Sequence, residues 1–130
     1  MASITEDLQT FLLTQTGLTA LVGQQIYPQT LPQNTTFPAI SYEVTNDTPN
    51  HTMGSEAANP RKPLITYNVW AETYKEAKQV SAQLHTALED KTGGLATRTL
   101  QWILFENEYD IYESDTEIHH IVVDFVVWYT

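Results

Sequence analysis

The chain has 130 residues, of which 16 are acidic and six are basic, so its formal net charge is −10. Such a charge repels phosphate backbones and anionic membranes, which argues against a protein that holds DNA or a lipid surface by electrostatic attraction. Cysteine is absent, which excludes disulfide bonds and thiolate metal sites.

The length predicts a single domain over residues 1–130 that can bury a core without covalent cross-links. No basic segment followed by an apolar run begins the sequence, and no apolar run reaches the ~20 residues that span a bilayer. We therefore expect a protein made in a reducing cytoplasm, without a signal peptide and without membrane contact.

The first predicted helix begins close to the N-terminus. Ser3 and Glu6 have the spacing of a capping box, in which each side chain binds the backbone amide of the other residue. Apolar residues then repeat at helical spacing, and Gly17 predicts the end of the helix. A short helical turn is expected over 18–22 and a short strand over 26–28.

Two strands are predicted on either side of a long loop. Residues 38–45 and 64–71 both alternate in polarity, and the second stretch is rich in β-branched and aromatic residues. Residues 46–62 have no periodicity and contain two prolines and a glycine. Loops longer than about 12 to 15 residues in a compact domain are usually functional or disordered.

The strand over 64–71 leads directly into an amphipathic helix, and the predicted fold is organised around this pair. Thr73 and Glu76 form a second capping box. The apolar stripe of the helix comprises Ala77, Val80, Leu84, Ala87 and Leu88. Gly93 and Gly94 predict its end. A strand joined to a helix that folds back over it is typical of a two-layer α+β domain.

Two more strands are predicted, over 97–105 and 119–129, with a strongly acidic segment over 106–117 between them. The last strand is apolar on both faces, whereas an antiparallel sheet with helices on one side normally has a polar second face. Trp70, Val126 and Trp128 would share that second face. Since a large exposed apolar patch indicates a protein interface, we predict a subunit interface at these three residues.

These elements together predict an α+β fold. Its sheet is antiparallel or mixed, with about four main strands, two helices packed on one face and the long loop between the second and third strands.

Catalytic and metal-binding arrangements are sparse. His120 and Asp124 share a strand face but lie about 13 Å apart along it, too far for a dyad. His119 and His120 point to opposite faces and make a poor chelate. The carboxylates over 106–117 imitate part of a calcium loop, but Ile111 stands where the sharp turn needs glycine. We predict no catalytic residue, no cofactor and no metal, and hence no enzyme.

A series of short motifs runs along nearly the whole chain. In order they are LTALVG at 18–23, IYP at 26–28, LP at 31–32, FPAISY at 37–42, VWAETY at 69–74, YDIYE at 109–113, DF at 124–125 and VWY at 127–129. In this order and spacing the chain resembles the tail-completion, or tail-terminator, family of long-tailed bacteriophages, also described as head–tail joining proteins.

The resemblance implies a structural protein of the virion at the head–tail junction, made in the host cytoplasm. Such proteins form homo-oligomeric rings, usually hexamers, that cap the tail tube protein, end tail polymerisation and provide the docking surface for the head connector or stopper protein. DNA passes through the lumen without specific binding, which suits an acidic surface. For contacts with the tube or a neighbouring subunit, the candidates in the predicted loop are His51, Met53, Arg61 and Lys62.

Two other functions stay open at this point. One is another head–tail connector or tail tube component, of which a tube subunit would form long polymers by itself. The other is a small ligand-binding or enzymatic α+β domain, which would need a pocket with convergent polar groups.

Overall fold

The computed structural model describes residues 4–33, 35–46, 62–89, 91–95, 99–114 and 116–129. Within these ranges the chain forms three helices and six strands. The helices are α1 (Ile4–Leu12), α2 (Thr16–Val22) and α3 (Tyr74–Leu88). The strands are β1 (Ile26–Pro28), β2 (Ala39–Asn46), β3 (Leu64–Ala71), β4 (Gly93–Gly94), β5 (Thr99–Glu113) and β6 (Ile118–Tyr129).

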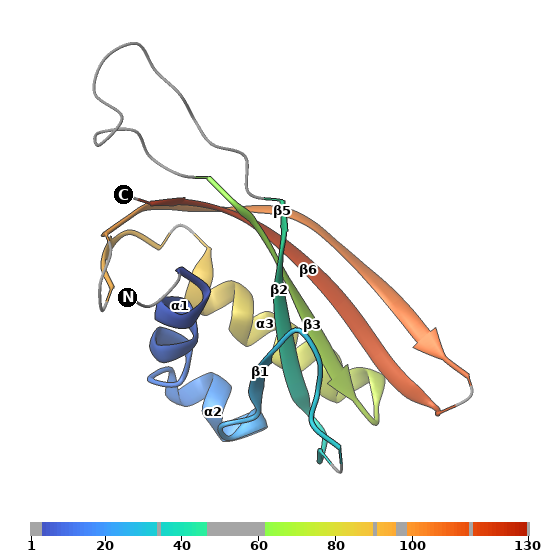
Figure 1. The fold of residues 1–130 in the computed structure, drawn as a ribbon. Coiled ribbons are helices and arrows are strands. Elements are labelled where there is room, and N and C mark those ends of the chain that lie inside the picture. The colour runs from blue at the N-terminus through green and yellow to red at the C-terminus, as the bar shows by residue number, and fades with distance from the viewer. Residues whose placement is uncertain are drawn as a thin grey trace, which may run out of the picture.

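The strands form one mixed sheet in the order β1-β2-β3-β6-β5-β4. β1 runs parallel to β2, and every other neighbouring pair is antiparallel. The sheet is curved, and the three helices lie along one of its faces (Figure 1). The predicted α+β fold with a mixed sheet is therefore confirmed. None of the helices in the described ranges is long and apolar enough to cross a membrane.

The number of elements differs from the prediction. β2, β3, β5 and β6 are the main strands, but the short β1 and β4 extend the sheet at its two edges. The fold has three helices where two were predicted, because the short helical turn expected over 18–22 is a full helix, α2, that begins at Thr16. Gly17 does not end the first helix, which stops at Leu12; instead it lies inside α2. A Cβ at Gly17 would come within 2.3 Å of the Gln83 side-chain oxygen on α3, so a larger residue here would displace the end of the Gln83 side chain.

The central helix begins as the sequence predicts. The Thr73 hydroxyl accepts a hydrogen bond of 3.2 Å from the Glu76 backbone amide. The helix ends at Leu88, earlier than the glycine pair, because Glu89 adopts an extended conformation. Gly93 and Gly94 instead form β4 and pair with the start of β5.

The acidic segment after residue 105 belongs to a strand. β5 continues to Glu113, and its pairing with β6 runs from Leu100–Tyr129 to Glu113–Ile118. Irregularities in the register fall between Leu100 and Trp102 and between Phe105 and Asn107. The strand persists through acidic residues because Glu108 and Asp110 find partners on α3.

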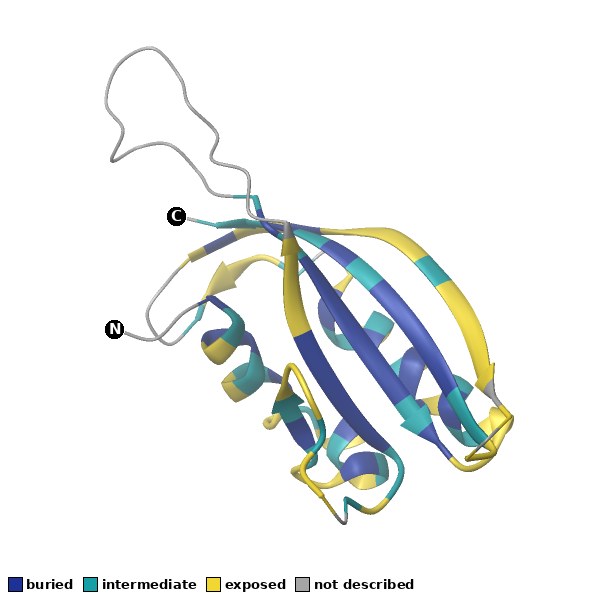
Figure 2. Ribbon diagram, turned by 45° about the vertical axis from the view of Figure 1, so that its right-hand side comes forward, coloured by how far each residue is buried: buried dark blue, intermediate teal, exposed yellow. Residues whose placement is uncertain are grey.

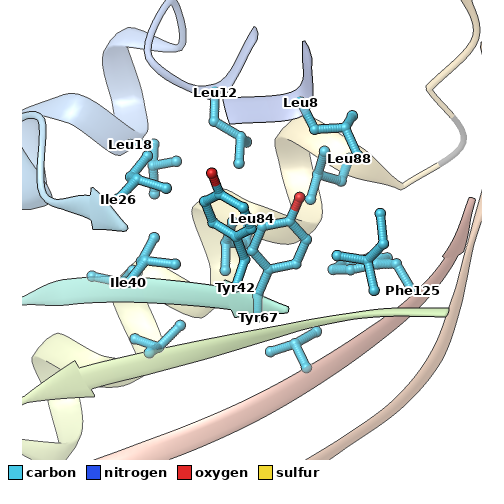
Figure 3. Close-up of a cluster of buried hydrophobic side chains, with 14 of the residues drawn as sticks. Leu8, Leu12, Leu18, Ile26, Ile40, Tyr42, Tyr67, Leu84, Leu88 and Phe125 are labelled. Atoms are coloured by element: carbon cyan, nitrogen blue, oxygen red, sulfur yellow. The ribbon is translucent and has the colours of Figure 1, made fainter. Parts of the chain in front are cut away.

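The core fills the space between the helices and the inner face of the sheet. Figure 3 shows Tyr67 and Phe125 of the sheet lying toward the leucines of the helices. The largest fully buried side chains are Leu8, Leu12, Leu18, Ile26, Ile40, Ile65, Tyr67, Leu84, Leu88, Leu100, Ile103 and Phe125. Because the described helices cover the inner face, partners could reach the sheet at its opposite face and at its edges.

Candidate assembly surface

The face of the sheet opposite the helices is called the outer face here. Buried Ile65, Tyr67 and Val69 point to the helices, so the alternate residues of β3 point outward. The register extends this face across the sheet. Trp70 lies opposite His120, Asn68 opposite Val122, Thr66 opposite Asp124, Leu64 opposite Val126, Leu104 opposite Val126, and Trp102 opposite Trp128.

One end of the outer face is apolar. We call it the apolar corner, and it consists of Leu64, Trp102, Leu104, Val126 and Trp128. The side chains of Trp102 and Leu104 are 44% and 37% exposed, whereas those of the other three are half-buried. Gln101, Trp102 and Trp128 line an open hollow. Two predicted interface residues, Val126 and Trp128, therefore lie together on an accessible surface.

Lys62 adjoins this corner. Its ammonium nitrogen lies 5.3 Å from the centroid of the Trp128 ring, within the range of a cation–π contact. Trp128 Nε1 is buried and has no hydrogen-bond partner among the described residues. The structure thus brings together one residue predicted for tube or neighbour contact and one predicted for the ring interface. The other predicted contact residues, His51, Met53 and Arg61, lie outside the described residues, as does most of the predicted loop.

Trp70 lies at the other end of the outer face. It is six residues from Leu64 along β3, or about 20 Å. Its ring stacks on His120 with 3.8 Å between centroids and 13° between planes. Its Nε1 donates to Ser41 Oγ at 3.4 Å, and His120 Nε2 lies 2.7 Å from Asn68 Oδ1. One side of the Trp70 indole is therefore covered within the chain, and Trp70 is not part of the apolar corner.

A polar row separates these two ends. The hydroxyl of Thr66 donates to Asp124 Oδ1 at 2.7 Å and is also hydrogen-bonded to the hydroxyl of Thr45. Asp124 is thus hydrogen-bonded to Thr66, whereas His120 Nε2 lies against Asn68. Across the described ranges, no group of three or more histidines and acids could hold a metal ion.

Trp102 and Leu104 belong to the apolar corner, although the sequence pattern did not predict them at the interface. In the sequence, Leu100, Trp102 and Leu104 alternate with their neighbours, which predicts that all three lie on one face of the strand. In the structure Leu100 is buried in the core, because the register shifts between Leu100 and Trp102. Such an irregularity re-aims the side chains that follow it, and alternation alone does not reveal it.

A second polar cluster joins the acidic half of β5 to α3. Glu108 Oε1 accepts from Ser81 Oγ at 2.5 Å and lies 3.0 Å from His85 Nε2. Lys78 Nζ lies 3.2 Å from Asp110 Oδ1 and 3.8 Å from Glu108 Oε2. Burial by itself would raise the pKa of Glu108. The hydrogen bonds from Ser81 and His85 and the charges of His85 and Lys78 outweigh burial, so this pKa lies below its usual value.

Comparisons with known proteins agree with this architecture. The family model described as tail completion protein gp17 matches residues 6–130. No curated protein sequence matches the chain. A solved chain from the virion of a native gene transfer agent particle is similar with a TM-score of 0.72 and 18% identity, covering 99% of this chain and 98% of that chain. Another solved chain has a TM-score of 0.51 and 13% identity, covering 97% and 96%. At these identities, the likeness shows a shared fold.

Proposed function

This chain belongs to the tail completion protein gp17 family, and from that membership we propose that it caps the phage tail tube as a ring and ends tail polymerisation. The family is structural, so the chain is a structural protein of the phage tail, located in the virion, and not an enzyme. The resemblance inferred from the ordered motifs is thereby confirmed.

The observation that carries the proposed ring is the apolar corner on a face that the described helices leave open. This corner has two tryptophans and a leucine at the edge of the face. A neighbouring chain that covers them removes their apolar surface from water, which stabilises the contact. A ring requires a heterologous contact, in which this corner meets a different surface of the next subunit and the rotation closes. We propose a hexamer with Val126 and Trp128 at the contact and Trp102 and Leu104 beside them. Trp70 would also join the contact if the neighbouring subunit extends across the polar row that separates Trp70 from the apolar corner.

The ring would face two partners. One side of the ring would bind the last ring of the tail tube protein, and the other side would provide the docking surface for the head connector or stopper protein. His51, Met53, Arg61 and Lys62 are the proposed contacts with the tube or a neighbour, and Lys62 already lies against Trp128. DNA crosses the lumen without specific binding, because a net charge of −10 per chain repels phosphate.

Light scattering coupled to size exclusion tests this proposal on the purified chain over a range of concentrations. A discrete mass of about six chains is the result expected for a closed ring. An open series of growing polymers would contradict ring closure and favour a tube subunit. A chain that stays monomeric is then mixed with purified tail tubes, and absence of density at the tube ends in electron micrographs would contradict capping.

Matched variants locate the contact. Trp128→Ser and Trp102→Ser should abolish the ring, or the capping of tubes, while circular dichroism shows an unchanged fold. Leu13→Ser is the control, because Leu13 is 36% exposed on the helical side of the molecule, away from the outer face. If both tryptophan variants assemble as well as this control, the apolar corner is not the ring contact.

A further inference from the structure

The last long strand of the sheet, β5, has an open edge. One side of β5 pairs with β6, and the other side pairs with β4 only at Thr99 and Leu100. From Gln101 to Glu113 no described strand lies beyond it, and Figure 2 shows this outermost strand largely exposed. Every second backbone N–H and C=O along this stretch therefore points away from the sheet, which is a template for an added strand.

The opposite edge of the sheet is protected. β1 has only three residues and ends at Pro28, which lacks an amide hydrogen. Gln29 follows with φ of 61° and donates its amide back to the Tyr42 carbonyl at 2.7 Å. Short length and proline are two of the features by which proteins prevent edge pairing. β5 is 15 residues long and contains no proline. The protective features that it does carry are its carboxylates and the two irregularities in its register.

The side chains of β5 also indicate association. Nine large apolar or aromatic residues are exposed in the described part of the chain, and six of them lie on β5. They are Trp102 and Leu104, which the proposed ring contact already uses, and Phe105, Tyr109, Ile111 and Tyr112, which it does not. An exposed, long, apolar edge strand in an isolated protein is expected to pair with another chain.

The charge of β5 indicates which kind of chain pairs with its open edge. β5 contains Glu106, Glu108, Asp110 and Glu113 and has no lysine or arginine. None of the six described strands contains a lysine or an arginine, so no described strand of a second copy offers the complementary charge. Pairing β5 with β5 of another copy would bring carboxylates close together, which is unfavourable.

We propose that the open edge of β5 binds, as an added strand, an extended segment of a different tail or head protein that carries lysine or arginine at alternate positions. Backbone hydrogen bonds would supply affinity, and the ion pairs with the acidic half of β5 would select the partner. Glu106 is the best single contact, because it is exposed, whereas Glu108 and Asp110 already have partners on α3. This inference rests on the place of the chain in the phage tail and does not depend on a hexameric ring.

Backbone amide hydrogen exchange tests the edge directly, on the free chain and on particles that contain it. Binding of a strand should slow the outward-facing amides between residues 105 and 113, which lie beyond the proposed ring contact, at least ~10-fold in the particle. Equal exchange in both states would overturn the proposal. Zero-length carbodiimide cross-linking of the particle then identifies the occupant, because it joins a carboxylate to a lysine amine. A link from β5 to a lysine of a different protein supports the proposal, and a link to a second copy overturns it.

A charge reversal provides the matched test. Glu106→Lys should lower incorporation into particles by ~10-fold, the effect of losing one favourable ion pair at the contact. Glu72→Lys is the control, because Glu72 is also exposed but lies in the turn between β3 and α3, and its effect should stay within ~2-fold. Equal loss in both variants would show that net charge matters, not the β5 edge. Ring formation is measured on the isolated chain and the edge contact by incorporation into particles, so each proposal can fail independently of the other.

Discussion

Replacing Glu108 with alanine should loosen the acidic half of β5 from α3. The carboxylate accepts hydrogen bonds from Ser81 and His85 and lies within 3.8 Å of Lys78. Ser81 is only 2% exposed, so its hydroxyl would lose its acceptor in a position where water reaches it poorly. The side chain of Glu108 is itself about one quarter exposed, which weakens its ion pairs with Lys78 and His85.

Most of the expected loss of stability comes from the Ser81 hydroxyl, which loses its acceptor, and less comes from the ion pairs of Glu108. A buried polar group without its partner costs about 1–3 kcal/mol, and a partly exposed ion pair contributes at most about 1 kcal/mol. We therefore expect Glu108→Ala to lower the free energy of unfolding by about 2 kcal/mol. For a domain of this size, that corresponds to a decrease in Tm of about 7 °C.

Thermal unfolding followed by circular dichroism measures this effect. Glu106→Ala is the control, because Glu106 is the neighbouring exposed carboxylate, and we expect its effect to stay below about 0.5 kcal/mol. A double-mutant cycle with Ser81→Ala should give a coupling energy of about 1 kcal/mol. Equal effects of Glu108→Ala and Glu106→Ala, or additive effects of the Ser81 and Glu108 variants, would refute this account.

The same interaction predicts a pH dependence. The pKa of Glu108 in the folded chain is lowered from its ordinary value of 4.5. Its contribution to stability is therefore complete above that value and is lost as the pH falls through the lowered pKa. The difference in Tm between the wild type and Glu108→Ala should be constant at neutral pH and shrink in acid. A difference that grows in acid would contradict the assigned direction.

Two further predictions concern the core and the central helix. Leu84→Ala should lower the free energy of unfolding, measured by chemical denaturation, by about 2–5 kcal/mol, because Leu84 is 0% exposed and its truncation leaves a cavity. In the same assay, Leu13→Ala at an exposed position should change it by less than about 0.5 kcal/mol. Thr73→Ala removes the hydroxyl that caps α3 and should cost about 1 kcal/mol. By contrast, Thr86→Ala on the exposed face of the same helix should be neutral or slightly stabilising in the same assay, and equal losses at both threonines would argue against the cap.

Local sequence signals were sufficient for the centre of the fold. The alternation over 64–71 and the helical stripe after Thr73 predicted β3 and α3, because pairing and burial here agree with the intrinsic periodicity. The two-sided apolar pattern of the last strand also predicted an open apolar surface, and Val126 and Trp128 lie on it. In each case, the residues that form the element also carry the signal.

Other features depended on contacts between distant segments. Gly17 was expected to end a helix, but it lies inside α2, beside the Gln83 side chain of α3. Trp70 was grouped with Trp128 because both point outward, but the sheet register places them at opposite ends and stacks Trp70 on His120. The register of a sheet depends on which strands become neighbours, and alternation within one strand does not contain that information.

The sequence by itself determined the class of this protein: its acidic charge, its main strands and central helix, and the ordered motifs that placed it among phage tail-completion proteins. These properties are local or compositional, so they can be read from the chain. Only the tertiary structure decided that the acidic segment after residue 105 is a strand, because Lys78, Ser81 and His85 of α3 offer partners to its carboxylates. That same long-range packing extends β5 and leaves it at the edge of the sheet with its outer side open.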